Sequence, residues 1–311
     1  MNKPMDDQLL DFQEIPTSAN MVMLTGWRQW ADAGTISSEL PAYLIKKTGA
    51  RKIGELKPEG FYLFQMPGTH HLLRPVVQIE DGQVLDLEQK RNEFYFSGDE
   101  QQGMIIFLGD EPHLNVERYG EALFNAVKAL GVKQMAGLAG VFGPTPYDKD
   151  RQVSCIYSLP EMRQGLEEYA VTFSNYEGGS SIDSYLVEMA GRKNIPYFAF
   201  YAFVPAYDFS QSAIQPRGIQ IERDYMAWLN VMQRLNHMLD LNIDLRELEK
   251  NSAEMVETID AKIEELIEEL PEFNIREYLD KLSADFDELS FVPLDDVWEQ
   301  GLRDLFNDMD E

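Results

Sequence analysis

The sequence has 311 residues, of which 44% are hydrophobic and 11% aromatic, so it can bury a full core and is not a disordered acidic chain. Its formal net charge of −27 argues against nucleic acid and anionic membranes as partners, because both bind basic surfaces. The single cysteine, Cys155, excludes an internal disulfide and a cysteine-rich metal site. The N-terminus lacks a signal-peptide core, and no stretch reaches the roughly 18 apolar residues of a membrane span, so we expect a cytoplasmic protein.

Short apolar runs alternate with helical patterns up to residue 204. In chain order we predict a strand at 21–25, a helix at 35–48, a β-hairpin at 75–88, a strand at 104–108, a helix at 116–130, a strand at 134–142, a helix at 161–169, a strand at 171–176, a helix at 181–193 and a strand at 196–204. Strands that alternate with helices pair in parallel, so the fold class is α/β, a three-layer α/β/α sandwich with the hairpin at one sheet edge.

The remaining chain has a helical pattern and a different charge. Residues 240–311 contain 24 acidic and 6 basic residues, a net charge of −18. We predict one helix at 219–240, then an apolar stripe from Leu245 to Leu270 that Pro271 interrupts. The stripe fits packing on its own chain or packing against a partner. We therefore divide the protein into an α/β body, 1–218, and an all-helical acidic C-terminal extension, 219–311.

Candidate functional residues lie in loops marked by glycine or proline after the predicted strands. In open α/β sheets, ligands bind beyond the carboxyl ends of parallel strands, so these loops share one rim. The loops are 26–34, 109–112, 140–147, 178–181 and 204–208. Their candidate ligand or partner residues are Trp27, Arg28, Asp32, Gly34, Asp110, Glu111, Gly140, Tyr147, Ser180 and Tyr207.

Each loop also has a purely structural interpretation. The first loop fits ligand recognition by stacking on tryptophan, but Asp32 equally fits the cap of the helix that follows. Asp110 and Glu111 suit Mg²⁺ with phosphate, or acid–base chemistry, but also a solvated turn. The glycines before Ser180 suit an anion at a helix N-terminus, or a plain cap.

The sequence carries little support for catalysis. There is no G-x-S-x-G elbow, and the glycines at 137, 140 and 143 lack the dinucleotide-binding spacing. Of the four histidines, only His113 lies near the predicted rim, and His70 and His71 point to opposite faces in an extended chain. We predict no catalytic residue, no metal site and no cofactor.

Several short motifs, in order, resemble the proteasome assembly chaperone 2 (PAC2) family over residues 15–290. They are Gly26-Trp27, Asp32-Ala33-Gly34, Arg74-Pro75, Gly109–Pro112, Ala190–Tyr207 and the acidic helical stretch Leu245–Leu289. The resemblance implies an α/β/α fold similar to purine nucleoside phosphorylases, with no established enzyme activity. Eukaryotic and archaeal relatives act as chaperones of 20S proteasome subunits or bind assembled proteasomes, and long bacterial relatives resemble homo-oligomers. This sequence departs from the family in carrying Gln29-Trp30 within the first motif. Its ending, 306–311, lacks the hydrophobic-Tyr-X tail of some archaeal relatives.

Two hypotheses follow. The first is a non-enzymatic assembly chaperone or scaffold that acts as a homo-oligomer on a protein partner, including proteasome subunits. The alternative is a hydrolase or phosphorylase-like enzyme that acts on a nucleoside or similar small molecule at the strand ends, with Asp32, Asp110, Glu111 or His113 as its acid–base group.

Overall fold

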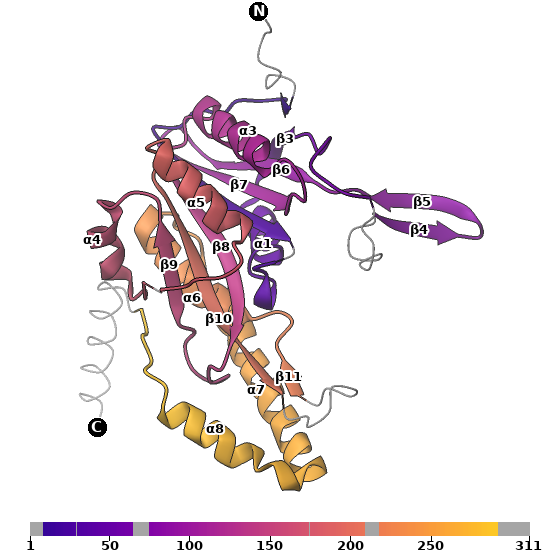
Figure 1. The fold of residues 1–311 in the computed structure, drawn as a ribbon, viewed down its shortest axis with the longest axis vertical. Coiled ribbons are helices and arrows are strands. Elements are labelled where there is room, and N and C mark those ends of the chain that lie inside the picture. The colour runs from indigo at the N-terminus through magenta and orange to yellow at the C-terminus, as the bar shows by residue number, and fades with distance from the viewer. Residues whose placement is uncertain (1–8, 29, 65–74, 174, 209–217, 292–311) are drawn as a thin grey trace, which may run out of the picture.

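In the part of the chain that the structure describes, nine strands form one mixed sheet between two helical layers (Figure 1). This computed structural model describes residues 9–28, 30–64, 75–173, 175–208 and 218–291. The sheet order is β1-β3-β6-β7-β2-β8-β10-β11, and β9 pairs with β10. The strands are β1 (Leu10–Phe12), β2 (Asn20–Arg28), β3 (Arg51–Leu56), β6 (Asn92–Gly98), β7 (Gln102–Asp110), β8 (Gln134–Gly143), β9 (Val153–Tyr157), β10 (Tyr197–Asp208) and β11 (Gly218–Gln220).

Helices cover both faces of this sheet. The α-helices are α1 (Glu39–Thr48), α3 (Val116–Ala129), α4 (Met162–Leu166), α5 (Ile182–Arg192), α6 (Tyr225–Leu239), α7 (Arg246–Glu269) and α8 (Ile275–Ala284). The short 3₁₀ turns are η2 (Ala33–Thr35), η3 (Glu167–Tyr169) and η4 (Pro271–Phe273). Helices α3 and α5 pack on one face, whereas α1 and α6 pack on the other.

The four central strands, β7, β2, β8 and β10, are parallel. Along β2 the side chains alternate: Met21 and Met23 enter the core under α3 and α5, and Val22 and Leu24 enter the core under α1 and α6. Both cores are buried, which is why these strands read as continuous apolar runs. The predicted three-layer α/β/α sandwich with a helical C-terminal region is confirmed. The division at residue 218 and the likeness to nucleoside phosphorylases stay predictions.

The outer strands differ from the prediction. Strands β6, β3 and β1 extend the sheet in antiparallel fashion beyond β7, and none of them was predicted. The predicted strand at 171–176 is wrong: in the described residues of that segment only Thr172 forms a bridge, with Ser154 of β9. The apolar run around Cys155 forms the strand instead, because it pairs with β10.

The predicted hairpin forms, but it does not lie at an edge of the main sheet. Strands β4 (Val76–Glu80) and β5 (Gln83–Glu88) make a separate two-stranded sheet. Gly82, at φ +84°, supplies the turn conformation that Asp-Gly predicts. The hairpin projects from the body on the connection between β3 and β6, and every residue in its strands is exposed (Figure 1).

The predicted helix at 219–240 begins later, at Tyr225. Ile219 pairs with Tyr207 in the sheet, so residues 218–220 are a strand. Asp224 then caps α6, since its Oδ1 accepts a hydrogen bond from the Ala227 amide at 3.0 Å. The helix predicted at 35–48 likewise begins at Glu39, after the turn η2.

The apolar stripe of the C-terminal region packs on its own chain. Leu248, Ile259 and Ile263 of α7 are buried in the same core as α1 and α6. At the surface, Glu247 of α7 accepts hydrogen bonds from Tyr43 (3.1 Å) and Lys47 (3.0 Å) of α1. An early helix of the chain and a late one therefore cover the same face of the sheet.

Candidate functional site

The carboxyl ends of β2, β7, β8 and β10 meet at one rim, as the parallel pairing requires. Arg28, the last residue of β2, lies opposite Asp110, the last residue of β7. The loop after β2 folds over β8, where Asp32 bridges to Gly140. The loop 178–181 follows no strand, but it leads into α5, whose first residue reaches the rim. The predicted rim therefore has four strand ends and one helix start.

Arg28 and Asp110 form the centre of a charge cluster at this rim. Asp110 is fully buried, and it accepts hydrogen bonds from Arg28 Nε (2.9 Å), Lys90 Nζ (3.3 Å) and the Arg91 amide (3.0 Å). Arg28 also donates to Glu88 at the base of the hairpin, at 2.9 Å. Burial alone would lower the pKa of Arg28. Its hydrogen bonds to Asp110 and Glu88 raise that pKa by a larger amount, so it lies above its usual value. This cluster fixes the hairpin base to the body.

Glu111 points away from that cluster, because successive residues at a strand end face opposite sides. Its Oε1 accepts a hydrogen bond from the Ile182 amide, the first residue of α5, at 3.0 Å. Its Oε2 accepts one from the Trp30 amide at 3.2 Å. Burial raises the pKa of Glu111, and the two backbone amides oppose that rise. A carboxylate of the chain itself therefore occupies the anion position at the start of α5.

Asp32 and Gly34 hold the first loop in place by contacts within the chain. Asp32 Oδ1 accepts hydrogen bonds from the Ser37 and Ser38 amides, both at 2.9 Å, just before α1 begins. Burial raises the pKa of Asp32, against the hydrogen bonds that lower it. Gly34 has φ +63°, and its carbonyl accepts a hydrogen bond from Trp228 Nε1 at 2.9 Å. A Cβ at Gly34 would lie 2.8 Å from the Asp224 Cβ, so the close backbone approach is to α6.

The other predicted rim residues do not gather at one surface. Trp27 is in the core, where its indole donates to the Tyr119 hydroxyl at 2.8 Å. Tyr207 is also buried, and it donates to the Thr145 carbonyl at 2.6 Å. Tyr147 donates to Asp260 of α7, and Ser180 is exposed. The buried Gly140 donates its amide to the Ala31 carbonyl at 2.9 Å.

Exposed aromatic rings stand at the rim. Trp30 is 71% exposed and Tyr176 is 74% exposed, the highest values among the large apolar side chains described. Both lie against the loop before α5: Tyr176 donates to the Gly179 carbonyl at 3.3 Å, and a Cβ at Gly179 would lie 3.9 Å from the Trp30 ring. Surface aromatics of this kind are typical anchors for protein partners.

A buried carboxyl beside the rim was missed in the sequence. Asp183 is 2% exposed, and its Oδ1 accepts a hydrogen bond from Tyr197 at 2.6 Å. The Tyr197 hydroxyl lies 2.9 Å from Thr25 Oγ1 of β2. Burial raises the pKa of Asp183 to about 7, while the Tyr197 hydrogen bond opposes the rise. Its position in the first turn of α5 favours a surface carboxylate, so the sequence offered no signal of this burial.

A buried ion pair was missed as well. Arg151 and Asp224, each fully buried, are 2.8 Å apart. Arg151 also donates to the backbone carbonyls of Pro146, Lys149 and Tyr147. It therefore ties the loop between β8 and β9 to the start of α6.

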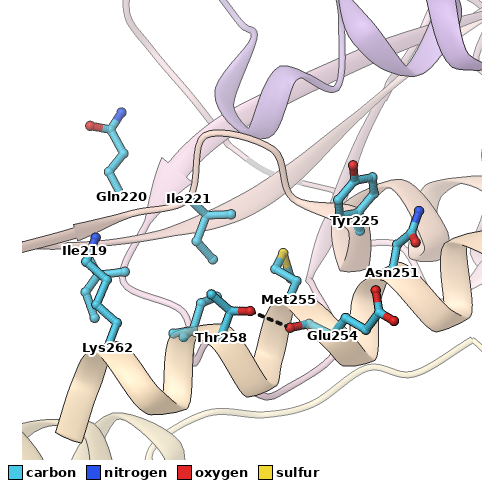
Figure 2. Close-up of a pocket in the computed structure, with 10 residues that line it drawn as sticks. Ile219, Gln220, Ile221, Tyr225, Asn251, Glu254, Met255, Thr258 and Lys262 are labelled. Atoms are coloured by element: carbon cyan, nitrogen blue, oxygen red, sulfur yellow. Dashed lines mark hydrogen bonds between the residues drawn. The ribbon is translucent and has the colours of Figure 1, made fainter. Parts of the chain in front are cut away.

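Four cavities on the described part of the chain have volumes of 430–770 Å³, and none of the four is lined by Asp32, Asp110 or Glu111. The cavity of about 430 Å³ lies beside the end of β7, because its lining residues Tyr62 and Lys90 both donate hydrogen bonds to Asp110. Figure 2 shows one of about 440 Å³, where Ile219 and Ile221 face Met255 and Thr258 of α7.

Histidines and metal ligands add little to the rim. His113 accepts a hydrogen bond from the Leu63 amide at 3.1 Å, and burial lowers its pKa. Three or more potential metal ligands do not gather anywhere in the described residues. His70, His71, Arg74 and the ending 306–311 lie outside them.

Comparisons with known proteins identify the family. The sequence profile of the PAC2 family matches residues 26–263. The chain belongs to the PAC2 family. No curated protein matches the sequence.

This PAC2 protein shares its fold with several solved structures. A PAC2 family protein from Streptomyces avermitilis is 22% identical, with a TM-score of 0.67 over 80% of this chain and 99% of that chain. A Mycobacterium tuberculosis proteasome-assembly chaperone homologue is 21% identical, with a TM-score of 0.66 over 78% and 94%. A protein of unknown function from the same organism is 17% identical, with a TM-score of 0.71 over 98% and 94%. The last match spans the helical C-terminal region of this PAC2 protein too.

Within the described residues of this PAC2 protein, no helix is long and apolar enough to cross a membrane.

Proposed function

We propose that this PAC2 protein is a non-enzymatic assembly chaperone or scaffold that acts as a homo-oligomer on protein partners. Proteasome subunits are the first candidates, since one relative of the same fold is a proteasome-assembly chaperone homologue. The observation that carries the proposal is Glu111. Its carboxylate accepts hydrogen bonds from the start of α5 and from Trp30, so the rim holds its own anion and presents exposed aromatic rings.

Three features support a protein partner over a small ligand. None of the four cavities described above is lined by Asp32, Asp110 or Glu111, whereas a small-molecule site encloses most of its ligand. Trp30 and Tyr176 lie on one loop cluster at the surface, where they can insert into a partner's pockets. The partner also meets a chain with net charge −27, which favours a basic surface.

The test is capture of the partner from the native host with the tagged full chain, followed by mass spectrometry. We expect one stoichiometric protein complex. The double variant Trp30→Ser/Tyr176→Ser should lose it, while Ile15→Ser, an exposed apolar site elsewhere on the chain (55% exposed), should retain it. Capture of no complex, or equal capture by all three proteins, would contradict the proposal.

The alternative is an enzyme of nucleosides, and it has a separate test. Phosphorolysis needs a phosphate site, yet Glu111 occupies the helix N-terminus that would bind the anion. We expect no change in melting temperature with a panel of nucleosides, with or without inorganic phosphate. A ligand at 100 times its Kd would stabilise the folded protein by about 2.7 kcal/mol, so a reproducible shift with any nucleoside would favour the enzyme.

A further inference from the structure

Strand β11 forms one edge of the main sheet and leaves backbone groups without a protein partner. In the described chain it pairs with β10 alone, through Gly218, Ile219 and Gln220. The pairing stops before Pro205 of β10, which has no amide proton to donate. The amide and carbonyl of Ile221, the next residue, form no hydrogen bond with any other described residue. An edge of this kind is a template for another strand.

A groove with apolar walls lies between this edge and α7 (Figure 2). Ile219 and Ile221 project from the same face of the chain, as residues two apart in a strand do. Met255 of α7 faces them across the cavity of about 440 Å³. The lining side chains of α7 run from Asn251 to Lys262. That part of the helix is roughly 16 Å long, which is the length of about five residues of extended chain.

The charges at the groove leave one cation uncompensated. The lining contains two charged side chains, Glu254 and Lys262. Glu254 pairs with Lys250 at 3.4 Å, one turn earlier on α7. Lys262 is exposed and forms no ion pair with any described residue. It lies beside Ile219, at the start of β11 (Figure 2). The groove therefore offers an anion a partner at one end.

We propose that this groove binds the C-terminal segment of a protein partner as an added strand. Antiparallel pairing with β11 is the more stable arrangement, and it brings the end of the added chain to the start of β11. There Lys262 can bind the terminal carboxylate. Alternate side chains of the segment then face Met255 and Tyr225, so we expect apolar residues at every second position. The inference goes beyond the proposed function, since it needs neither Trp30 nor Tyr176.

The first experiment selects ligands for the full chain from random hexapeptides that are displayed with free C-termini. We expect enrichment of apolar residues at alternate positions. The enriched peptide, labelled at its N-terminus, is then titrated by fluorescence polarisation. A C-terminal amide should weaken binding at least 10-fold. Proline at the positions between the apolar residues should abolish binding, because proline cannot donate a main-chain hydrogen bond.

Variants of the chain locate the peptide in the groove. Lys262→Gln should weaken binding of the free acid at least 10-fold, whereas Lys281→Gln, the same change at an exposed position of α8, should leave it within 2-fold. The losses caused by Lys262→Gln and by the C-terminal amide should not add, because both remove one contact. Thr258→Trp should fill the groove and abolish binding. Ala261→Trp, exposed on the same helix but outside the lining, should retain it. All four variants should melt at the wild-type temperature.

The other outcomes overturn the inference. These are no enrichment of apolar peptides, or unchanged binding in Thr258→Trp, which would place the peptide elsewhere. Equal binding of the acid and the amide would make an internal segment of a partner the occupant. Peptide binding that is lost as the chain self-associates at higher concentration would make a second copy the occupant. Capture of a complex through Trp30 and Tyr176 is measured separately and depends on none of these results.

Discussion

At the scale of single residues, the buried carboxyl of Asp183 makes stability depend on pH. Burial raises its pKa from 3.8 to about 7. The folded state therefore retains a proton that the unfolded state loses between about pH 4 and 7, so this group lowers the free energy of unfolding as pH rises through that window. Above pH 7 the Asp183 carboxyl is charged in both states, so the cost of burying that charge lowers the free energy of unfolding by a constant amount.

The variant Asp183→Asn should remove this dependence, because the amide is neutral and its oxygen can still accept from Tyr197. The free energy of unfolding of the variant minus that of the wild type should increase by about 2–3 kcal/mol from pH 5 to pH 8. Urea denaturation at both pH values measures the difference, with Glu161→Gln as an exposed control. Parallel pH profiles for Asp183→Asn and wild type would contradict the prediction.

Asp224 has two roles that one substitution can separate. It is the counter-charge of the buried Arg151 and the cap of α6. Asp224→Ser keeps a cap oxygen but leaves the guanidinium without its partner, so we expect a loss of about 3 kcal/mol or more of unfolding free energy. Asp224→Ala should lose about 1 kcal/mol more, through the cap. Chemical denaturation at pH 7 tests both; equal stability of Asp224→Ser and wild type would refute the ion-pair role.

At the scale of elements, α7 is part of the core of the body. Leu248 of α7 is fully buried in the core that α7 shares with α1 and α6. We expect Leu248→Ala to destabilise the protein by about 2–5 kcal/mol. The variant Thr258→Ala, at an exposed position of the same helix, is the control for Leu248→Ala.

Deletion of 241–311 should expose the core beneath α6 and lower solubility. A soluble, equally stable truncated body would show that the core is complete without α7.

The central elements could be predicted from sequence, and the peripheral ones could not. Strands β2, β7, β8 and β10 are buried on both faces, so their apolar runs are unambiguous. Strand β3 contains Gly54 at an irregularity in its pairing, which weakens its pattern. The alternation of Phe94 and Phe96 in β6 is the sequence signal that indicates this strand, since both side chains face the core. The position of the hairpin outside the sheet depends on tertiary contacts that no local pattern encodes.

The rim shows the same limit. Parallel pairing predicted that Arg28, Asp32, Asp110 and Glu111 lie at one edge, and the structure places them there. The sequence does not show which carboxylate pairs with which cation or amide, because those contacts join residues far apart in the chain. The burial of Trp27 and Asp183 follows from α3 and α5 covering that face, which only the folded arrangement reveals.

At the scale of the whole molecule, the net charge of −27 opposes compactness. Glu265, Glu268 and Glu269 lie together at the C-terminus of α7, where the helix dipole also disfavours negative charge. Salt screens such exposed charges, since the Debye length falls to about 3 Å at 1 M. We therefore expect the melting temperature to rise between 20 mM and 500 mM NaCl.

Replacing these three glutamates with glutamine should raise the melting temperature at low salt and flatten its salt dependence. Thermal unfolding at fixed pH measures both proteins. A melting temperature that is constant with salt in the wild-type chain would show that the excess negative charge does not affect folding.

The contact between α1 and α7 cannot form until the ribosome has synthesised α7. Lys47 and Glu247 meet across 200 residues of sequence. At translation rates of about 5–20 residues per second, about 10–40 s pass between the synthesis of Lys47 and the synthesis of Glu247. Throughout that interval the sheet face under α1 lacks its late helices while the chain is still attached to the ribosome. An unfinished chain therefore exposes apolar surface of the kind that folding chaperones bind.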